Sequence, residues 1–306
     1  MTKIIECVPN FSEGRCVKTI DALTKTAQSI PGVSLVDRHI DPSHNRMVLT
    51  LMGDPTGIKT AAIALAKCAR DTIDLTKQTG EHPRMGAIDV IPFVPIKDTT
   101  MEECVAISKE AGQTIATDLG IPVFLYEEAA TSEERLNLAD IRRGQFEGMA
   151  VKMQSPNWRP DYGNAAPHPT AGVVAVGARM PLIAFNANLS TSDINIANKI
   201  AKKVRGSSGG LKYCKAIGIM IKEKNLAQVS MNLVNYEDTS IYSALELIKA
   251  EAKRYGVSVV ETELIGLAPA KALIDCAEYY LQLADFDYRR HVLENYIPLI
   301  HANSEE

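Results

Sequence analysis

The residues best suited to acid–base chemistry lie in one short run, Gly80-Glu81-His82-Pro83-Arg84-Met85-Gly86. Glu81 and Arg84 place opposite charges beside His82, and the proline and glycines restrict the backbone of the loop. A loop histidine between charged neighbours is well placed to titrate near neutrality. Loop placement adds weight to a functional role, and the alternative, a surface histidine in a turn, stays open at this point. His82 is therefore the first candidate for a group that accepts and returns a proton.

A second polar run, Asp37-Arg38-His39-Ile40-Asp41-Pro42-Ser43-His44-Asn45-Arg46, brackets Asp41 with two histidines. These residue types suit a metal ion, but their spacing matches no familiar metal site. We therefore predict no metal here and interpret the run as a polar turn near an active site.

Two strand-like segments, Leu182–Leu189 and Leu226–Val234, alternate apolar residues with amides and a hydroxyl. Alternation puts every second side chain on the same face of a sheet. That face is expected to carry uncharged donors and acceptors, and we interpret it as a binding surface. The alternative is a polar sheet face without a ligand. Its residues are Asn186, Asn188, Gln228, Ser230 and Asn232.

The elements that must position these residues follow one order twice. In the first half, apolar spacing predicts strands at 4–8, 33–36, 47–51 and 88–94 and helices at 17–27 and 58–73. In the second half it predicts strands at 182–189, 213–221, 226–234 and 257–265 and helices at 194–204 and 241–252. The order is β-α-β-β-α-β in each half.

This repetition predicts an α+β protein made of two tandem ferredoxin-like subdomains with a ligand cleft between them. The subdomains are expected at residues 1–178 and 179–306. Additional helices are predicted at 101–118, 270–283 and 288–296. Residues 154–172 lie between the two repeats and are rich in proline, glycine and asparagine. Long loops of this kind are often functional.

The composition limits the class of protein. The 306 residues carry a net charge of -4, which argues against a surface dominated by nucleic-acid binding. No signal peptide or membrane-spanning run is visible, so we expect a cytoplasmic protein that does not bind membranes. The six cysteines are scattered without a Cys-x-x-Cys pair, which argues against disulfides and a zinc ribbon.

Several long motifs in the chain closely resemble the formiminotransferase family. They are Glu6-Cys7-Val8-Pro9-Asn10-Phe11-Ser12-Glu13-Gly14, the run 80–95, Leu182-Ile183-Ala184-Phe185-Asn186, Leu226-Ala227-Gln228-Val229-Ser230-Met231-Asn232-Leu233 and Leu264-Ile265-Gly266-Leu267. The likeness extends from about residue 3 to residue 280. It implies a single-function transferase without the cyclodeaminase module, acting in histidine degradation and one-carbon metabolism.

The resemblance implies transfer of the formimino group from N-formimino-L-glutamate to tetrahydrofolate, the co-substrate, with His82 as catalytic acid/base. It also implies a homodimer and no metal. We predict substrate binding by Asn10, Asp37, His39, Asp41, Asn45, Arg46, Glu81, Arg84 and the five residues of the C-terminal sheet face. The folate-contacting segment of the family falls on Gly163, Asn164, Ala165, Ala166, Pro167, His168, Pro169, Thr170, Ala171 and Gly172.

The proposed chemistry needs one proton removed from N5 of tetrahydrofolate and one delivered to the departing glutamate nitrogen. A histidine with a pKa near the working pH can do both. The cationic amidine needs an anion, for which Glu81 and the acids at 37 and 41 are alternatives. Arg46 and Arg84 are candidates to pair with carboxylates of glutamate or folate.

Three other functions stay open at this point. One is formyl transfer between 5-formyltetrahydrofolate and glutamate at the same site. Another is a non-catalytic folate-binding or regulatory protein, against which the charged neighbours of His82 weigh. RNA binding is weaker, because the chain is acidic and has no paired exposed aromatic residues on a strand.

Overall fold

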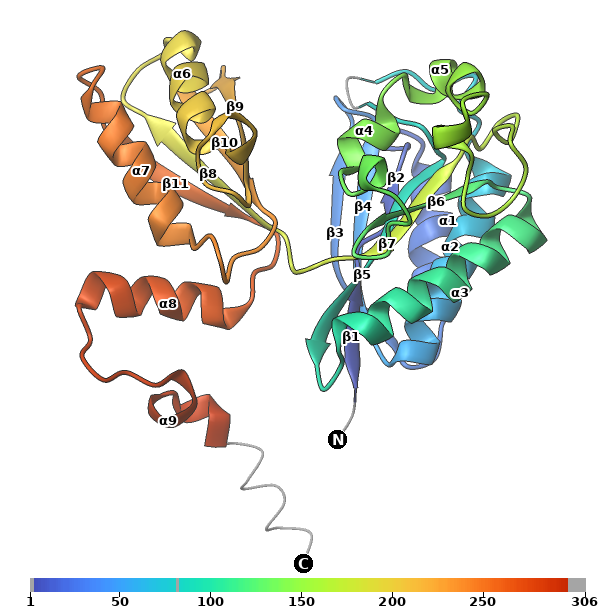
Figure 1. Ribbon diagram of the computed structural model, residues 1–306, viewed down its shortest axis with the longest axis horizontal. Helices are drawn as coiled ribbons and strands as arrows, with labels where there is room; N and C mark the ends of the chain where they lie inside the picture. The colour runs from blue at the N-terminus through green and yellow to red at the C-terminus, as the bar shows by residue number, and fades with distance from the viewer. Residues whose placement is uncertain (1–2, 81–82, 297–306) are drawn as a thin grey trace, which may run out of the picture. The chain divides into compact units, whose positions relative to one another are not determined.

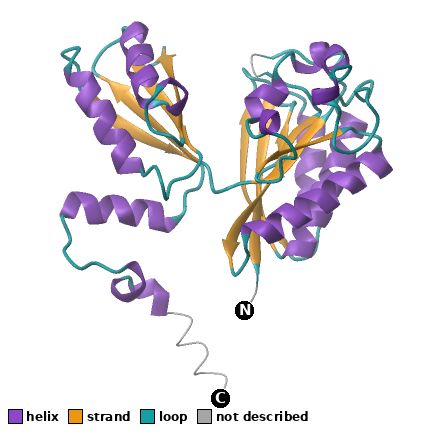
Figure 2. Cartoon of the chain, in the orientation of Figure 1, coloured by secondary structure: helices purple, strands orange, loops and turns teal. Residues whose placement is uncertain are grey.

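The computed structural model describes residues 3–80 and 83–296, and its chain divides into two compact units. Unit 1 comprises Met1–Met180 and unit 2 comprises Pro181–Glu306. Each unit has its own sheet and its own helices, so the fold is mixed α+β (Figures 1 and 2). The prediction of an α+β protein with two sheets in two domains is confirmed.

Unit 1 is built on a seven-stranded sheet. Its strands are β1 (Ile4–Cys7), β2 (Asn10–Phe11), β3 (Val33–Asp41), β4 (Arg46–Gly53), β5 (Ile88–Lys97), β6 (Val123–Glu127) and β7 (Val174–Ala178). Strand β4 pairs antiparallel with β1, β2 and β3, and β5 pairs antiparallel with β1 and β2. The strands β7 and β6 continue the sheet beyond β5 in parallel.

Three long helices cover one face of this sheet: α1 (Val17–Gln28), α2 (Pro55–Thr72) and α3 (Met101–Leu119). Local sequence explains where they begin. Asp54 accepts hydrogen bonds from the backbone amides of Thr56 and Gly57, and Pro55 occupies the first turn of α2. A capping box between Thr100 and Glu103 starts α3.

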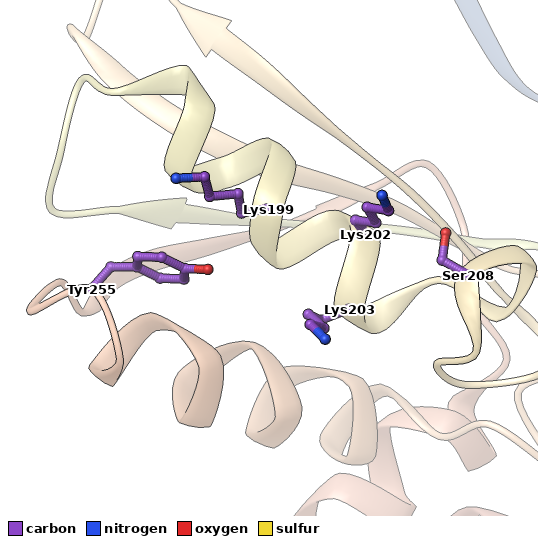
Figure 3. A pocket seen from close by; sticks show the side chains of 5 residues that line it. All are labelled: Lys199, Lys202, Lys203, Ser208 and Tyr255. Atoms are coloured by element: carbon purple, nitrogen blue, oxygen red, sulfur yellow. The ribbon is translucent and has the colours of Figure 1, made fainter.

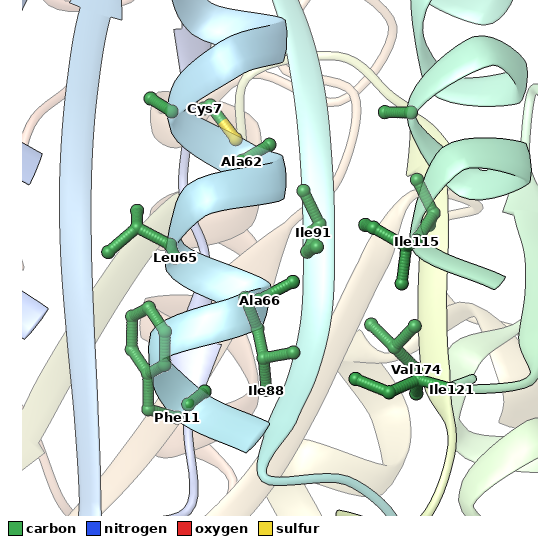
Figure 4. Packing of buried hydrophobic residues seen from close by; sticks show 14 of the residues in the cluster. Cys7, Phe11, Ala62, Leu65, Ala66, Ile88, Ile91, Ile115, Ile121 and Val174 are labelled. Carbon is green, nitrogen blue, oxygen red and sulfur yellow. The ribbon is translucent and has the colours of Figure 1, made fainter. Parts of the chain in front are cut away.

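The core of unit 1 lies between these helices and the sheet. Leu65 and Ala66 of α2 pack beside Ile88 and Ile91 of β5, and Ile115 of α3 packs near them (Figure 4). These side chains are fully buried, and burial of each large one stabilises the fold by about 1.5–3 kcal/mol. The apolar side chains of β4 also face this core, so its intervening side chains face the opposite side of the sheet.

Two shorter helices, α4 (Leu138–Arg142) and α5 (Gln145–Lys152), cover part of that opposite face. Ile141 and Met149 pack there with Val90 of β5 and Ala175 of β7 in a separate cluster. The part formed by β3, β4, β1 and β2 has no helix of unit 1 packed over it among the described residues. We call this part the open face of unit 1.

Unit 2 contains β8 (Ile183–Leu189), α6 (Ile194–Val204), β9 (Cys214–Ile221), β10 (Leu226–Leu233), α7 (Ile241–Lys253) and β11 (Val259–Ile265). Its four strands are antiparallel in the order β11-β8-β10-β9. Helices α6 and α7 pack on one face around Ala187, Val229 and Met231. Beyond this sheet lie α8 (Ala270–Leu281), α9 (Tyr288–His291) and a 3-10 turn at Leu293–Tyr296.

The structure corrects two expectations about the chain. Residues 154–172 do not connect the two repeats, because β7 follows them and belongs to the sheet of unit 1. The helix predicted at 288–296 is broken at Val292 into α9 and the 3-10 turn. Among the described residues, no helix has the length and apolarity needed to cross a bilayer.

Candidate active site

Glu81 and His82 lie outside the described residues, but the structure describes the residues on either side of them. On the N-terminal side, Gly80 rests on the turn between β3 and β4. A Cβ atom at Gly80 would overlap the carbonyl oxygen of His44 and crowd the Cβ of Asn45. Only a glycine allows this close approach. The run that contains His82 therefore starts against the second polar run identified in the sequence.

Asn45 joins three loops at this turn. Its side chain is buried, and its backbone has a φ of 51°. The Oδ1 atom accepts a hydrogen bond from the amide of Gly14 at 2.8 Å. Its Nδ2 group donates to Gln78 Oε1 and, at 3.1 Å, to the carbonyl of Thr79. Asn45, predicted to bind substrate, uses both of its amide hydrogens and its Oδ1 atom in contacts that join loops.

The second polar run lies on the open face of unit 1. Strand register places Asp37 opposite Thr50, His39 opposite Val48 and Asp41 opposite Arg46. The residues that alternate with these along β3 and β4 face the helices. The structure thus brings three predicted residues of β3 and one of β4 onto a single surface.

Arg46 is a half-buried cation without a carboxylate partner among the described ion pairs. Its guanidinium donates two hydrogen bonds to Oδ1 of Asn10, one of them from Nε at 3.0 Å. Burial, with the nearby charge of Arg142, lowers the pKa of Arg46 from its usual value. A desolvated guanidinium held by a neutral amide retains donors for an anionic ligand.

The two acids of this run differ in how many partners they have. Asp41 accepts hydrogen bonds from the amides of Ser43 and His44 at 2.9 and 3.0 Å and pairs with His44 Nδ1 at 2.6 Å. Burial pushes the pKa of Asp41 upward, but the hydrogen bonds from His44 outweigh it and the pKa lies below its usual value. Asp37 makes none of the described side-chain hydrogen bonds or ion pairs and is half-buried, so it is the acid with free acceptor capacity.

Arg84 makes protein contacts rather than presenting a free cation. Its Nη2 atom donates to the carbonyl of Gln78 at 2.7 Å and pairs with Glu147 of α5 at 2.9 Å. Only 13% of its side chain is exposed, and its Nε is buried without a partner. The candidate role of Arg84 as a carboxylate ligand is therefore less well supported than that of Arg46.

The predicted folate segment lies beside the residues that follow His82. Gly86 forms an isolated bridge with Gly172, and the amide of Val173 donates to the carbonyl of Met85 at 3.0 Å. A Cβ atom on either glycine would overlap the backbone of the other strand. Residues 163–166 are exposed, whereas Ala171 and Gly172 are buried. The two segments are thus in contact through backbone alone at this point.

His168 stabilises the turn that ends the segment. Its Nδ1 atom accepts from the amides of Thr170 and Ala171 at 3.3 and 3.0 Å. Its amide and carbonyl pair with those of Gly172. Burial, reinforced by the charge of Arg70, lowers the pKa of His168. Because Nδ1 accepts hydrogen bonds, the neutral ring carries its proton on Nε2.

The polar side chains predicted in unit 2 share one face of its sheet. Asn186 lies opposite Ser230, Asn188 lies opposite Gln228, and Asn232 follows on β10. The Nε2 group of Gln228 donates a hydrogen bond to Oδ1 of Asn188 at 2.8 Å, and both side chains are buried. Helices α6 and α7 pack on the other face of the sheet.

The expectation of an uncharged face in unit 2 is wrong. Strand β11 places Glu261 opposite Asn188 and Glu263 opposite Asn186. Glu261 accepts a hydrogen bond from Asn188 Nδ2 at 2.6 Å. The alternation of amides and apolar residues belongs to β8 and β10, and the neighbouring edge strand β11 adds the carboxylates.

Sequence reasoning missed several buried polar residues that support the site. Glu13 accepts hydrogen bonds from the amides of Arg15 and Cys16 with one oxygen and from Gln78 Nε2 with the other, each at 2.8 Å. Asp89 is 2% exposed and pairs with Arg142. Glu13 lies in the N-terminal motif, whereas no local signal distinguishes a buried Asp89 from a solvated one.

A concave pocket of unit 2 is formed by Lys199, Lys202, Lys203, Ser208 and Tyr255 and has a volume of about 240 Å³ (Figure 3). It contains none of the predicted site residues. Lys202 and Lys203 lie in the last turn of α6, where cations interact favourably with the helix dipole. No group of three or more His, Cys, Asp or Glu side chains in residues 3–80 and 83–296 can hold a metal ion.

The sequence is similar to known proteins over nearly its whole length. The model of the formiminotransferase domain, N-terminal subdomain, matches residues 4–179, and that of the formiminotransferase domain matches residues 184–293. A glutamate formimidoyltransferase of Streptococcus pyogenes serotype M1 is 61% identical over 97% of this chain and 99% of its own length. One of Thermoplasma acidophilum is 46% identical over 93% of this chain and 94% of its own. The formimidoyltransferase-cyclodeaminase of Mus musculus is 43% identical, covering 92% of this chain and 53% of its own length.

Proposed function

This chain belongs to the formiminotransferase family, and from that premise we propose the reaction that its site performs. It is a glutamate formimidoyltransferase that moves the formimino group from N-formimino-L-glutamate to tetrahydrofolate and releases L-glutamate. The observation that carries this conclusion is 61% identity along nearly the full length of a glutamate formimidoyltransferase. Tetrahydrofolate is the co-substrate, and histidine degradation is the process implied by the family.

The reaction requires three things of the protein. The donor and tetrahydrofolate must be held together, which can contribute about 7–11 kcal/mol to lowering the barrier in favourable cases. Attack of N5 on the amidine carbon gives a tetrahedral adduct. The adduct breaks down when one proton leaves N5 and one reaches the departing glutamate nitrogen. We assign both transfers to His82, whose loop begins at Gly80, packed against the turn between β3 and β4.

Charge complementarity suggests roles for the open face of unit 1. Arg46 is the cation with donors left for a ligand, and we assign it to a carboxylate of the glutamate moiety. Asp37 is the acid on the same face without a described partner, and we assign it to the cationic amidine. Asp41 is fully engaged by the turn and is the weaker candidate. Asn10 positions Arg46.

Two finer features are part of the same proposal. The order of β1, α1, β3, β4, α2 and β5, and that of β8, α6, β9, β10, α7 and β11, support a ferredoxin-like arrangement for each unit. The boundary between subdomains is proposed near residue 178, with folate bound along residues 163–172. The enzyme is proposed to be a homodimer in the cytoplasm, without nucleic-acid or membrane partners.

The test is a side-by-side assay of the purified protein with tetrahydrofolate and either N-formimino-L-glutamate or N-formyl-L-glutamate. We expect 5-formiminotetrahydrofolate and free glutamate from the first donor at a rate well above that of formyl transfer from the second. Faster formyl transfer would instead assign the chain to the second reaction. Binding of tetrahydrofolate without turnover of either donor would assign it to the non-catalytic alternative.

A further inference from the structure

Hydrogen bonds hold the backbone of residues 84–86, shortly after His82 in the chain. Arg84 O accepts from the amide of Phe146 at 2.8 Å, Met85 O accepts from the amide of Val173, and Gly86 O accepts from Ser12 Oγ at 2.7 Å. Three different parts of unit 1 thus hold the carbonyls of this short segment. The backbone carbonyls of residues 84, 85 and 86 therefore all accept a hydrogen bond.

The backbone amides of Met85 and Gly86 share one acceptor, the carboxylate of Asp89. Its Oδ1 atom accepts from the amide of Met85 at 2.7 Å and from that of Gly86 at 3.3 Å. Its Oδ2 atom pairs with Arg142 at the end of α4, at 2.7 Å to Nε and 2.5 Å to Nη2. A carboxylate that is 2% exposed is costly to bury unless such donors surround it.

A β-bulge gives Asp89 this position. Asn10 of β2 pairs with Val90, while the adjacent Phe11 pairs with Ile88, so Asp89 is the extra residue of β5. A bulge bends the strand and redirects a side chain, and bulges are over-represented next to active sites. Here the redirected carboxylate accepts hydrogen bonds from the amides of Gly86 and Met85, which lie three and four residues earlier in the chain.

We propose that Asp89, held by Arg142, is a positioning residue for formimino transfer. It fixes the Met85–Gly86 segment, which follows His82 in the chain. This inference rests on the proposed role of His82 and adds two residues to the machinery of the same reaction. Neither residue is assigned contact with a substrate.

Three variants of the full chain separate positioning from folding. Asp89→Ala removes the acceptor and the charge, Asp89→Asn keeps an acceptor for the two amides, and Arg142→Gln keeps the carboxylate but removes its cation. Glu110→Gln is the control, because it breaks the exposed ion pair with Lys59 on the helical side of the unit. Each protein is compared for kcat, for the KM of both substrates, and for amide hydrogen exchange over residues 83–88.

We expect Asp89→Ala to lower kcat by about 10- to 100-fold, since a displacement on the order of 1 Å has that effect on positioned groups. Both KM values should stay within about threefold, and exchange at Met85 and Gly86 should accelerate, because their amides lose their acceptor. Asp89→Asn should recover most of kcat and of the protection. The kcat and the amide protection of Arg142→Gln should lie between those of Asp89→Asn and Asp89→Ala. Both quantities should match the wild type in Glu110→Gln.

Wild-type kcat together with wild-type exchange in a folded Asp89→Ala protein would overturn the proposal. An increase in KM with an unchanged kcat would also overturn it. Equal losses of kcat in the alanine and asparagine variants would do the same. If Asp89→Ala does not fold, the comparison of Asp89→Asn with Arg142→Gln decides by the same criteria. Absence of formimino transfer by the wild type would instead count against the proposed function, and the exchange data would still show whether Asp89 fixes the segment.

Discussion

At the scale of single residues, the chemistry depends on His82 and on the charges placed near its loop. We expect His82→Ala to lower turnover by about 100-fold or more, because general acid–base catalysis of both proton transfers is lost. Circular dichroism and tetrahydrofolate binding should stay close to those of the wild type. His291→Ala, in the C-terminal region, is the matched control. Wild-type turnover in a folded His82→Ala protein would rule out the assignment.

Arg46 should act through binding of the donor. Arg46→Gln removes the charge near the proposed carboxylate but keeps a polar side chain next to Asn10. A hydrogen bond to a charged group contributes about 1.5–3 kcal/mol, so the KM for formiminoglutamate should rise about 10- to 100-fold. The KM for tetrahydrofolate should change less. A larger effect on tetrahydrofolate than on the donor would move Arg46 to the folate side of the site.

His168 should titrate below the usual histidine range, since burial disfavours its charged form. A histidine with a depressed folded pKa contributes stability above its unfolded pKa, and this contribution is lost as the pH falls through the folded pKa. Protection of the amides of Thr170 and Ala171 should therefore weaken on acidification from about pH 7 to about pH 5. A nuclear magnetic resonance titration that places the pKa above 6.5 would contradict this expectation.

At the scale of elements, residues 154–172 are anchored by a buried ion pair. Asp161 pairs with Arg135 at 2.5 Å and accepts from the amide of Leu125 in β6 at 2.8 Å. The side chains of the pair are 7% and 8% exposed. The anchor joins the start of the proposed folate segment to the sheet.

Asp161→Asn should keep the acceptor for Leu125 but leave Arg135 without its counter-ion. Breaking a buried pair costs about 3–5 kcal/mol, so urea unfolding should shift to lower denaturant concentration. The KM for tetrahydrofolate should rise, while the KM for the donor should change less. The exposed pair between Lys271 and Asp275 in unit 2 provides the control variant Asp275→Asn, for which both measurements should match the wild type. Equal changes in both KM values would argue against a specific connection to folate.

Most elements with a clear period were predictable from the sequence. Helices α1, α2, α6 and α7 have apolar stripes, and α2, α6 and α7 also have side-chain N-caps; their predicted residues are confirmed within a few positions. Strands β6 and β7 were missed because every residue or nearly every residue in them is buried, which removes the alternation. Helix α4 has only five residues, too few to establish a period.

The site was predictable in its residue types but not in its connections. The polar run 37–46 was identified from composition, and the structure places Asp37, His39 and Asp41 on one face. The roles of Asn45 and Arg84 in joining loops depend on partners more than 30 residues away in the chain, at Gly14 and Glu147. Such pairings depend on tertiary structure and have no local signature.

At the scale of the whole molecule, the described core clusters each lie within one unit. The single tryptophan, Trp158, belongs to unit 1. Its fluorescence should therefore report the unfolding of unit 1, while far-ultraviolet circular dichroism reports both units.

We expect Ile200→Ala, in the core of unit 2, to lower the stability of that unit by about 2–5 kcal/mol. The midpoint followed by tryptophan fluorescence should stay in place, while part of the circular dichroism change moves to lower urea. Leu65→Ala in unit 1 is the reciprocal variant and should move the fluorescence midpoint. A common shift of both signals in both variants would mean that the units unfold as one cooperative body.

The glycine contacts around the His82 loop restrict which positions can be redesigned. Gly80, Gly86 and Gly172 each touch backbone of another segment, so random mutagenesis there should yield mainly inactive or insoluble clones. Asp37 and His39 lie on the open face of unit 1, opposite Thr50 and Val48 of β4. A library that varies these two positions and keeps the glycines is therefore the practical starting point for directed evolution toward other amidine or acyl donors.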